Sequence, residues 1–351
     1  GIFDGLEGYG INFGTHLNAW TSCDATTYTF TATNSENLEM VLKALDDIAT
    51  VAIFPEGQIE VERNKILEEA RPDESIDGIE HELFREMYTE GTPYEECNTI
   101  GTSEGIRTVT SQDLIEYYDL WYRPDLMAVV LVGDLPTEVL ETKIIEYFAD
   151  NPEKVGPEPI LTQISNPYNE RKIRTFTHPE TTNIVSIDYS TPLAPQGTLG
   201  SEYEKFLLNL VFDLANENIM TRVESGETIF SEPWGLVWSE DFNLRFFGWG
   251  FDSDNPTEEL KEFFKEVRFL EETGFTEGLL ERELAELANV LNGALGMSDG
   301  RQDRSYADAL VGHFLNGAPV ADPETLIGTW LSWVDEVALE DVNSYFFWLM
   351  N

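Results

Sequence analysis

The feature that most constrains the fold is an internal repeat at an offset of 221 residues. Residues 54–62, FPEGQIEVE, align with residues 275–283, FTEGLLERE, and five of the nine positions are identical. At the same offset and without a gap, Phe30 at the end of one predicted strand falls on Phe251 at the end of another. We therefore predict that the two halves of the chain use one fold twice.

The order of the predicted elements indicates the α+β class, because strands and helices are grouped and do not alternate strictly. A strand or hairpin is predicted at residues 18–32, and strands at residues 126–132, 181–191, 235–239 and 243–251. Helices are predicted at residues 37–49, 59–70, 113–122, 137–149 and 202–220. Four prolines mark residues 151–171 as a linker. We expect two homologous domains, residues 1–150 and 172–351, each an antiparallel-rich sheet with helices packed on it.

The charge of the chain excludes several partners. Lys and Arg number 21 against 66 Asp and Glu, a net charge of −45. Nucleic acids and anionic membranes need a basic surface, so neither is an expected partner. No apolar run approaches the roughly 18 residues that span a bilayer. The acidic surface is compatible with a cationic substrate, but we favour a saline or extracytoplasmic setting, such as the periplasm.

The two cysteines, Cys23 and Cys97, indicate little about the fold or the function. They form neither a disulfide framework nor a cluster of thiolate metal ligands. Cys23 lies in a strand-like run, so we interpret it as a small buried apolar residue.

The predicted helix at residues 59–70, IEVERNKILEEA, distributes its acids unevenly. At about 100° per residue, Ile59, Ile66 and Ala70 form one apolar stripe. Glu62 and Glu69 are seven residues apart and lie together along the edge of that stripe. Two carboxylates placed in this way are typical of a metal ligand supported by a second acid.

The repeat separates the two acids. Glu62 aligns with Glu283, but Glu69 aligns with Val290. A glutamate with a structural role should recur in both halves, whereas a functional glutamate can be confined to one.

Spacing alone leaves another interpretation open. Zinc usually needs two histidines besides a carboxylate, and no two of the four histidines (His16, His81, His178 and His313) have the spacing His-x3-His. Glu62 and Glu69 could therefore form a solvated or salt-bridged helix edge, with Arg63 and Lys65 nearby.

Four ordered segments resemble one family over nearly the whole chain. They are GYGINFGTHLNAWTSCDATTY, FPEGQIEVERNKILEEAR, PYEECNTIGTSEGI and YYDLWYRPDLMAVVLVGDL. The sequence resembles the pitrilysin/insulysin family of inverted-zincin metallopeptidases, especially the bacterial multidomain zinc proteases of the pyrroloquinoline-quinone-locus type. The resemblance implies a catalytic first domain and a catalytically silent second domain, which agrees with Val290.

The resemblance also implies roles for particular residues. Glu69 would be the third protein ligand of zinc, and Glu62 would orient a ligand. The strand with Asn18 and Ala19 would bind an extended peptide substrate through its main chain, although Asn18 could equally be a strand-end turn residue. Arg222 could reach the substrate from the second domain.

The assignment of Arg222 has a competing explanation. The family arginine is followed seven residues later by tyrosine, and position 229 is Ile. A positive charge near the C-terminus of a helix, which favours the helix dipole, explains Arg222 equally well.

The sequence departs from the family at the catalytic motif, His-x-x-Glu-His, which the 351 residues do not contain. By family spacing its place is upstream of Gly1, so no catalytic residue is expected in the chain and the chain alone should be inactive. We expect a part of a zinc-dependent endopeptidase that hydrolyses extended peptides, completed by an upstream segment and by a second pair of homologous domains. The alternatives are a non-catalytic structural or partner subunit of the same fold and a peptide-binding module.

Overall fold

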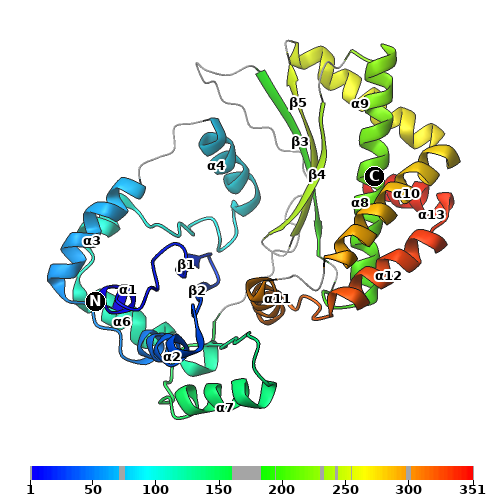
Figure 1. Cartoon of the computed structure of the whole chain (residues 1–351). Coiled ribbons are helices and arrows are strands. Elements are labelled where there is room, and N and C mark those ends of the chain that lie inside the picture. Colours follow the sequence, from blue (N-terminus) through cyan, green and yellow to red (C-terminus); the bar gives the residue numbers. More distant parts are fainter. Residues whose placement is uncertain are drawn as a thin grey trace. The chain divides into compact units, whose positions relative to one another are not determined.

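The chain folds as two compact units, Gly1–Thr162 and Gln163–Asn351. The structure is a computed structural model, and it describes residues 2–70, 76–159, 183–193, 195–229, 233–241, 244–253, 255–297 and 302–350. Each unit combines helices with an antiparallel sheet (Figure 1). The predicted α+β class is therefore confirmed.

The first unit contains one β-hairpin and a set of helices. Its elements are α1 (Ile2–Glu7), β1 (Leu17–Thr21), β2 (Thr26–Phe30), α2 (Ser35–Thr50), α3 (Glu56–Glu69), α4 (Ile76–Thr89), α5 (Ser103–Thr108), α6 (Ser111–Trp121), the 3₁₀ turn η1 (Pro124–Leu126) and α7 (Thr137–Phe148). Strand β1 pairs with β2 in antiparallel register from Leu17 opposite Phe30 to Thr21 opposite Thr26.

One end of the hairpin is fixed by a small apolar core. The buried residues of this core come from α1, β1, α2 and the segment between α1 and β1, and are Leu6, Ile11, Leu17, Val41 and Ala44. Phe30 packs against them from β2. Burial decreases along β1, from buried Leu17 to exposed Thr21. The core therefore fixes the end of the hairpin that lies opposite its turn.

Helix α2 is capped at its N-terminus by Asn34. The side chain of Asn34 accepts a hydrogen bond from the backbone N–H of Asn37 at 3.0 Å. This bond satisfies one of the free N–H groups of the first turn.

The second unit is built on a three-stranded antiparallel sheet in the order β3-β5-β4. Its elements are β3 (Asn183–Pro192), α8 (Leu199–Ser225), β4 (Pro233–Asp241), β5 (Leu244–Ser253), α9 (Pro256–Thr273), α10 (Glu277–Gly296), α11 (Asp303–Asn316), α12 (Pro323–Glu336) and α13 (Leu339–Met350). The sheet and helix α8 share a core in which Phe247 and Trp249 of β5 meet Phe206 and Leu214 of α8.

The predicted repeat is visible in the helices. At the offset of 221, Ser35 and Glu56, the first residues of α2 and α3, fall on Pro256 and Glu277, the first residues of α9 and α10. Because two consecutive helices begin in register, the repeat is a repeat of structure as well as of sequence.

The strand predicted at residues 126–132 is wrong. Residues 127–132 have no strand assignment, and most are half-buried. A strand needs a hydrogen-bonded neighbour, and in the described part of the chain none pairs with this segment.

The predicted linker lies partly outside the described residues. Residues 151–159 are described and pack on the end of the first unit: Arg123 donates to the carbonyl of Pro157 at 3.0 Å, and Lys154 lies 3.3 Å from Asp119. The remaining linker residues, 160–171, are not described.

Candidate functional site

Helix α3 carries both candidate acids on one continuous helix. Glu62 is exposed and forms an ion pair with Lys65 at 2.8 Å. Glu69, the last residue of α3, is also exposed. Among the described residues, its carboxylate has no hydrogen-bond or ion-pair partner. Glu69 is therefore available to an external ligand, whereas Glu62 already has a cationic neighbour.

The packing face of α3 differs from the predicted apolar stripe. Ile59 and Ala70 are half-buried as expected, but Ile66 is 37% exposed. Arg63 packs inward instead: its guanidinium donates to the carbonyl of Ile106 and, at 2.8 Å, to that of Val109. These carbonyls lie at the C-terminal end of α5, where backbone acceptors lack helical partners. Arg63 thus fixes α3 to α5.

The outer edge of β1 directs backbone groups away from β2 in a regular pattern. Thr31 donates to the carbonyl of His16 at 2.7 Å, and Ser22 donates to that of Ala25 at 2.8 Å. Hydrogen-bonded pairs alternate with non-bonded pairs in an antiparallel ladder, so Ala19 and Thr21 direct their backbone groups away from β2. At Leu17 this edge is bridged to Phe13, and beyond that bridge no described strand pairs with it.

Asn18 covers part of this edge. Its Oδ1 accepts a hydrogen bond from the backbone N–H of Ala19 at 2.9 Å. Its own carbonyl oxygen accepts from the hydroxyl of Thr29 on β2 at 3.3 Å. Asn18 and Ala19 therefore lie where the sequence analysis placed them, on an edge strand.

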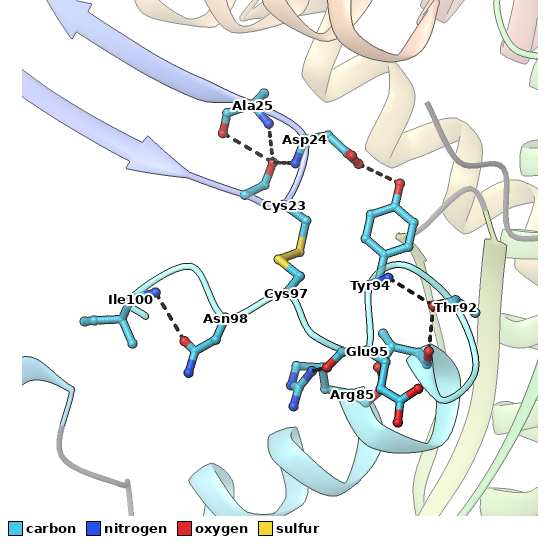
Figure 2. The surroundings of a disulfide bond; sticks show 12 residues. Cys23, Asp24, Ala25, Arg85, Thr92, Tyr94, Glu95, Cys97, Asn98 and Ile100 are labelled. Carbon is cyan, nitrogen blue, oxygen red and sulfur yellow. Dashed lines mark hydrogen bonds between the residues drawn. A yellow bond between two sulfur atoms is a disulfide. The ribbon is translucent and has the colours of Figure 1, made fainter. Parts of the chain in front are cut away.

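A disulfide joins Cys23 to Cys97, which corrects the prediction for both cysteines (Figure 2). Cys23 is exposed and not a buried apolar residue, because it lies in the turn between β1 and β2. Cys97 belongs to the segment of residues 90–102, called here the α4–α5 loop. Seventy-four positions separate the two cysteines, and no sequence pattern indicates that turn and loop meet.

Two side-chain hydrogen bonds hold the hairpin besides the disulfide. The hydroxyl of Tyr94 in the α4–α5 loop donates to Asp24 in the turn at 2.8 Å (Figure 2). The hydroxyls of Tyr28 on β2 and Tyr122 after α6 lie 2.5 Å apart. Burial, with the hydrogen bond to Tyr28, raises the pKa of Tyr122, so its hydroxyl stays protonated. Sequence reasoning did not identify these contacts.

The described residues do not complete a metal site. Among them no three His, Cys, Asp or Glu side chains are grouped closely enough to hold a metal ion. Both cysteines are in the disulfide and cannot act as thiolate ligands. His16 accepts from the backbone N–H of Asn12 at 3.2 Å, and His178 lies outside the described residues. Glu69 thus offers the chemistry of one zinc ligand, but zinc needs three or four.

Arg222 lies in the last turn of α8 and is already engaged. Its guanidinium binds Glu266 of α9 with two hydrogen bonds, 2.7 and 3.3 Å long, and Glu227 at 2.8 Å. The side chain of Glu266 is only 3% exposed. The guanidinium also lies 4.5 Å from the ring centre of Phe269. A role of Arg222 in substrate binding stays a prediction.

The counterpart of Glu62 in the second unit lies among other acids. Glu283 on α10 is close to Asp213 of α8, and surrounding protein atoms desolvate both carboxyl groups. This burial raises the pKa of Glu283, and together with the charges of Glu283 and Glu286 it raises the pKa of Asp213 to about 6. Taken over the whole residue, Asp213 is nevertheless exposed.

Two family profiles match the chain. The profile described as "Peptidase M16 inactive domain" matches residues 108–287, and "Insulinase (Peptidase family M16)" matches residues 4–93. Together they include β1, β2, α3 and most of the second unit.

Individual relatives agree with the profiles. The probable zinc protease PqqL of Escherichia coli is 24% identical over 335 residues, which cover 92% of this chain and 35% of that protein. The mitochondrial-processing peptidase subunit beta of Neurospora crassa is 29% identical over 212 residues, covering 56% of this chain and 44% of that one. The chain thus spans about a third of the length of the E. coli protein.

The fold is also similar to a solved structure. The crystal structure of the first half of the periplasmic protease PqqL from Escherichia coli matches with a TM-score of 0.84 at 20% identity. The match covers 99% of this chain and 76% of that one.

Proposed function

The chain belongs to the M16 peptidase family, and from this premise we propose that it is part of a zinc-dependent metalloendopeptidase that hydrolyses extended peptides. The observation that carries the proposal is the position of Glu69. It ends α3 with an exposed carboxylate, and its counterpart in the repeat is Val290. An acid that only the first unit retains suits a metal site in that unit.

In this proposal Glu69 supplies one carboxylate ligand and Glu62 orients the ligands from one flank of α3. Two turns of helix separate the two acids along α3, so Glu69 would hold the metal and Glu62 would support the ligands around it. The two histidines and the general base would come from a His-x-x-Glu-His motif, which the 351 residues do not contain. A zinc ion held there would supply Lewis-acid chemistry for the scissile carbonyl and for a water molecule.

The peptide binds along the outer edge of β1. Ala19 and Thr21 direct backbone groups outward, and an extended peptide can add to them as a further strand. Main-chain pairing is independent of the side chains of the peptide, which suits an endopeptidase that accepts extended segments.

The disulfide supports a location outside the cytoplasm, since disulfides persist in oxidising compartments such as the periplasm. No helix in the described ranges has both the length and the apolar character that a membrane span requires.

The test uses the natural polypeptide that carries these residues together with a His-x-x-Glu-His segment. Glu69→Gln should remove stoichiometric zinc and peptidase activity, because the amide cannot replace the charged ligand. Glu68→Gln, the adjacent position on α3, should retain both. Equal zinc content in the two variants would refute the ligand assignment. The 351 residues alone should neither retain zinc nor hydrolyse peptides. Activity of that chain would contradict the proposal that the two histidines and the general base come from a motif that it does not contain.

A second candidate function is that of a non-catalytic partner subunit. Two observations favour it: a profile described as an inactive domain matches residues 108–287, and a similar protein is by name a subunit. A natural polypeptide that contains no His-x-x-Glu-His motif, and that purifies with a second protein, would support this alternative. A polypeptide that contains the motif and binds zinc would support the peptidase.

A further inference from the structure

The disulfide cross-links two segments of the first unit that lie far apart in the sequence. Cys23 lies in the turn between β1 and β2, and Cys97 lies in the α4–α5 loop (Figure 2). Cys23 is exposed and Cys97 is half-buried. Exposed disulfides are more readily reduced than buried ones.

The α4–α5 loop provides a fixed base for this link. Tyr94 is only 5% exposed. The carboxylate of Glu95 accepts from the backbone N–H of Gly91 at 2.7 Å, and the carbonyl of Glu95 accepts from Arg85 of α4 at 3.3 Å. Thr92 donates to the carbonyl of Thr89, the last residue of α4, through its hydroxyl at 2.6 Å and through its backbone N–H at 2.9 Å. These bonds keep the loop on the end of α4.

The turn, in contrast, has few contacts of its own. Ser22, Asp24 and Thr26 are exposed, and the apolar core lies at the opposite end of β1 and β2. Tyr122 holds β2, the other strand of the hairpin, through hydrogen bonds to Thr26 and Tyr28. Ser22 forms hydrogen bonds within the turn, to Ala25 and to the backbone N–H of Asp24. In the described residues the turn is held to the α4–α5 loop by the disulfide and by the bond between Asp24 and Tyr94.

We propose that the Cys23–Cys97 disulfide is a redox-sensitive clamp that, when oxidised, holds the turn end of β1 in place for peptide binding and, when reduced, releases it. Its link to peptide binding rests on the proposed function of the β1 edge. In the oxidised protein the disulfide and the hydrogen bond between Asp24 and Tyr94 both hold the turn to the α4–α5 loop. After reduction only that hydrogen bond remains of the two. Peptide binding must then also order β1, and this loss of conformational entropy lowers the affinity for the peptide.

The reduction needs a dithiol. Its thiolate attacks the exposed Sγ of Cys23, and Cys97 leaves as a thiolate that takes up a proton. The second thiol of the reductant attacks the mixed disulfide and displaces Cys23 as the other thiol. Two electrons pass to the protein, and the dithiol becomes a disulfide.

The experiment compares the oxidised 351-residue protein with the same protein reduced by dithiothreitol, with thiols counted by mass spectrometry after alkylation. Hydrogen exchange is measured at the amides of Trp20 and Ser22, which face β2. The amides of β5 in the second unit serve as an internal control, because that unit contains no cysteine. Affinity is measured by fluorescence anisotropy with a fluorescein-labelled peptide of alternating threonine and valine with a lysine at each end.

Reduction should speed exchange at Trp20 and Ser22, leave β5 unchanged, and weaken peptide binding about tenfold, equivalent to roughly 1.4 kcal/mol. The double variant Cys23→Ser, Cys97→Ser should behave like the reduced protein and not respond to dithiothreitol. Tyr94→Phe, which removes the bond to Asp24 but keeps the disulfide, should stay redox-sensitive.

Equal exchange rates in the oxidised and reduced protein would overturn the clamp. Faster exchange with unchanged affinity would overturn its link to peptide binding. If the peptide binds neither form, the proposed peptide edge fails, and the exchange rates alone decide the clamp. Since reduction is applied to the folded wild-type protein, poor folding of the double variant does not remove the test.

Discussion

The side chain of Asn18 accepts a hydrogen bond at 2.9 Å from the backbone N–H of Ala19, the residue that follows it on β1. Ala19 directs its backbone away from β2, so this N–H is one of the groups that an added peptide strand would use. In the free protein the amide oxygen of Asn18 therefore takes the place of a peptide carbonyl.

Asn18→Ala should increase the affinity for an extended peptide about fivefold, because the peptide no longer has to displace a hydrogen bond worth roughly 1 kcal/mol. Titration of a labelled peptide by fluorescence anisotropy measures this change. Thr27→Ala on β2, away from the outer edge, should leave the affinity unchanged. A loss of affinity in Asn18→Ala would show instead that the side chain of Asn18 binds the peptide directly.

Arg63→Ala should lower the free energy of unfolding by about 1–3 kcal/mol, since the carbonyls of Ile106 and Val109 lose their donor. Urea unfolding followed by circular dichroism measures the effect. Lys65→Ala is the matched control on α3: its ion pair with Glu62 is exposed, and its loss should cost less than about 1 kcal/mol. Equal effects of the two variants would contradict the structural role of Arg63.

Arg222→Ala should be strongly destabilising, by about 3–5 kcal/mol, because it leaves the buried carboxylate of Glu266 without its guanidinium. Arg268→Ala, whose partner Glu272 is exposed, should have little effect in the same unfolding measurement. If Arg222 also binds substrate, Arg222→Lys will weaken peptide binding in protein that is still folded. Unchanged binding in that variant would leave Arg222 with its structural role alone.

The pKa of Asp213, raised to about 6 in the folded protein from an ordinary value of 3.8, predicts a dependence of stability on pH. Between these values the folded state binds more protons than the unfolded state, so stability falls as pH rises through this window. Asp213→Asn should therefore raise the thermal midpoint at pH 7.5 and change it little below pH 3.8. The exposed residue Glu224 on the same helix gives the control Glu224→Gln, for which we expect no such difference. A shift of equal size at both pH values would contradict the raised pKa.

The sequence predicted those elements whose apolar residues recur with a regular period. The helix expected at residues 37–49 is α2, which extends from Ser35 to Thr50. Shared residues at a fixed offset also predicted that α3 and α10 are counterparts, because identity at five of nine positions does not depend on tertiary contacts.

Features that depend on contacts between distant segments were missed. An even number of cysteines in a chain expected outside the cytoplasm was the only signal for the disulfide, since the proximity of Cys23 and Cys97 arises from the fold. The burial of Arg63 was missed for a related reason. Its partners are backbone carbonyls of α5, which no pattern within α3 reveals.

The central claim, that Glu69 is a zinc ligand, is tested most directly by an anomalous difference map collected at the zinc absorption edge from crystals of the natural polypeptide that carries His-x-x-Glu-His. We predict one peak about 2.0–2.2 Å from a carboxylate oxygen of Glu69, with Glu62 beyond ligand distance. A zinc peak whose ligands do not include Glu69 would contradict the claim.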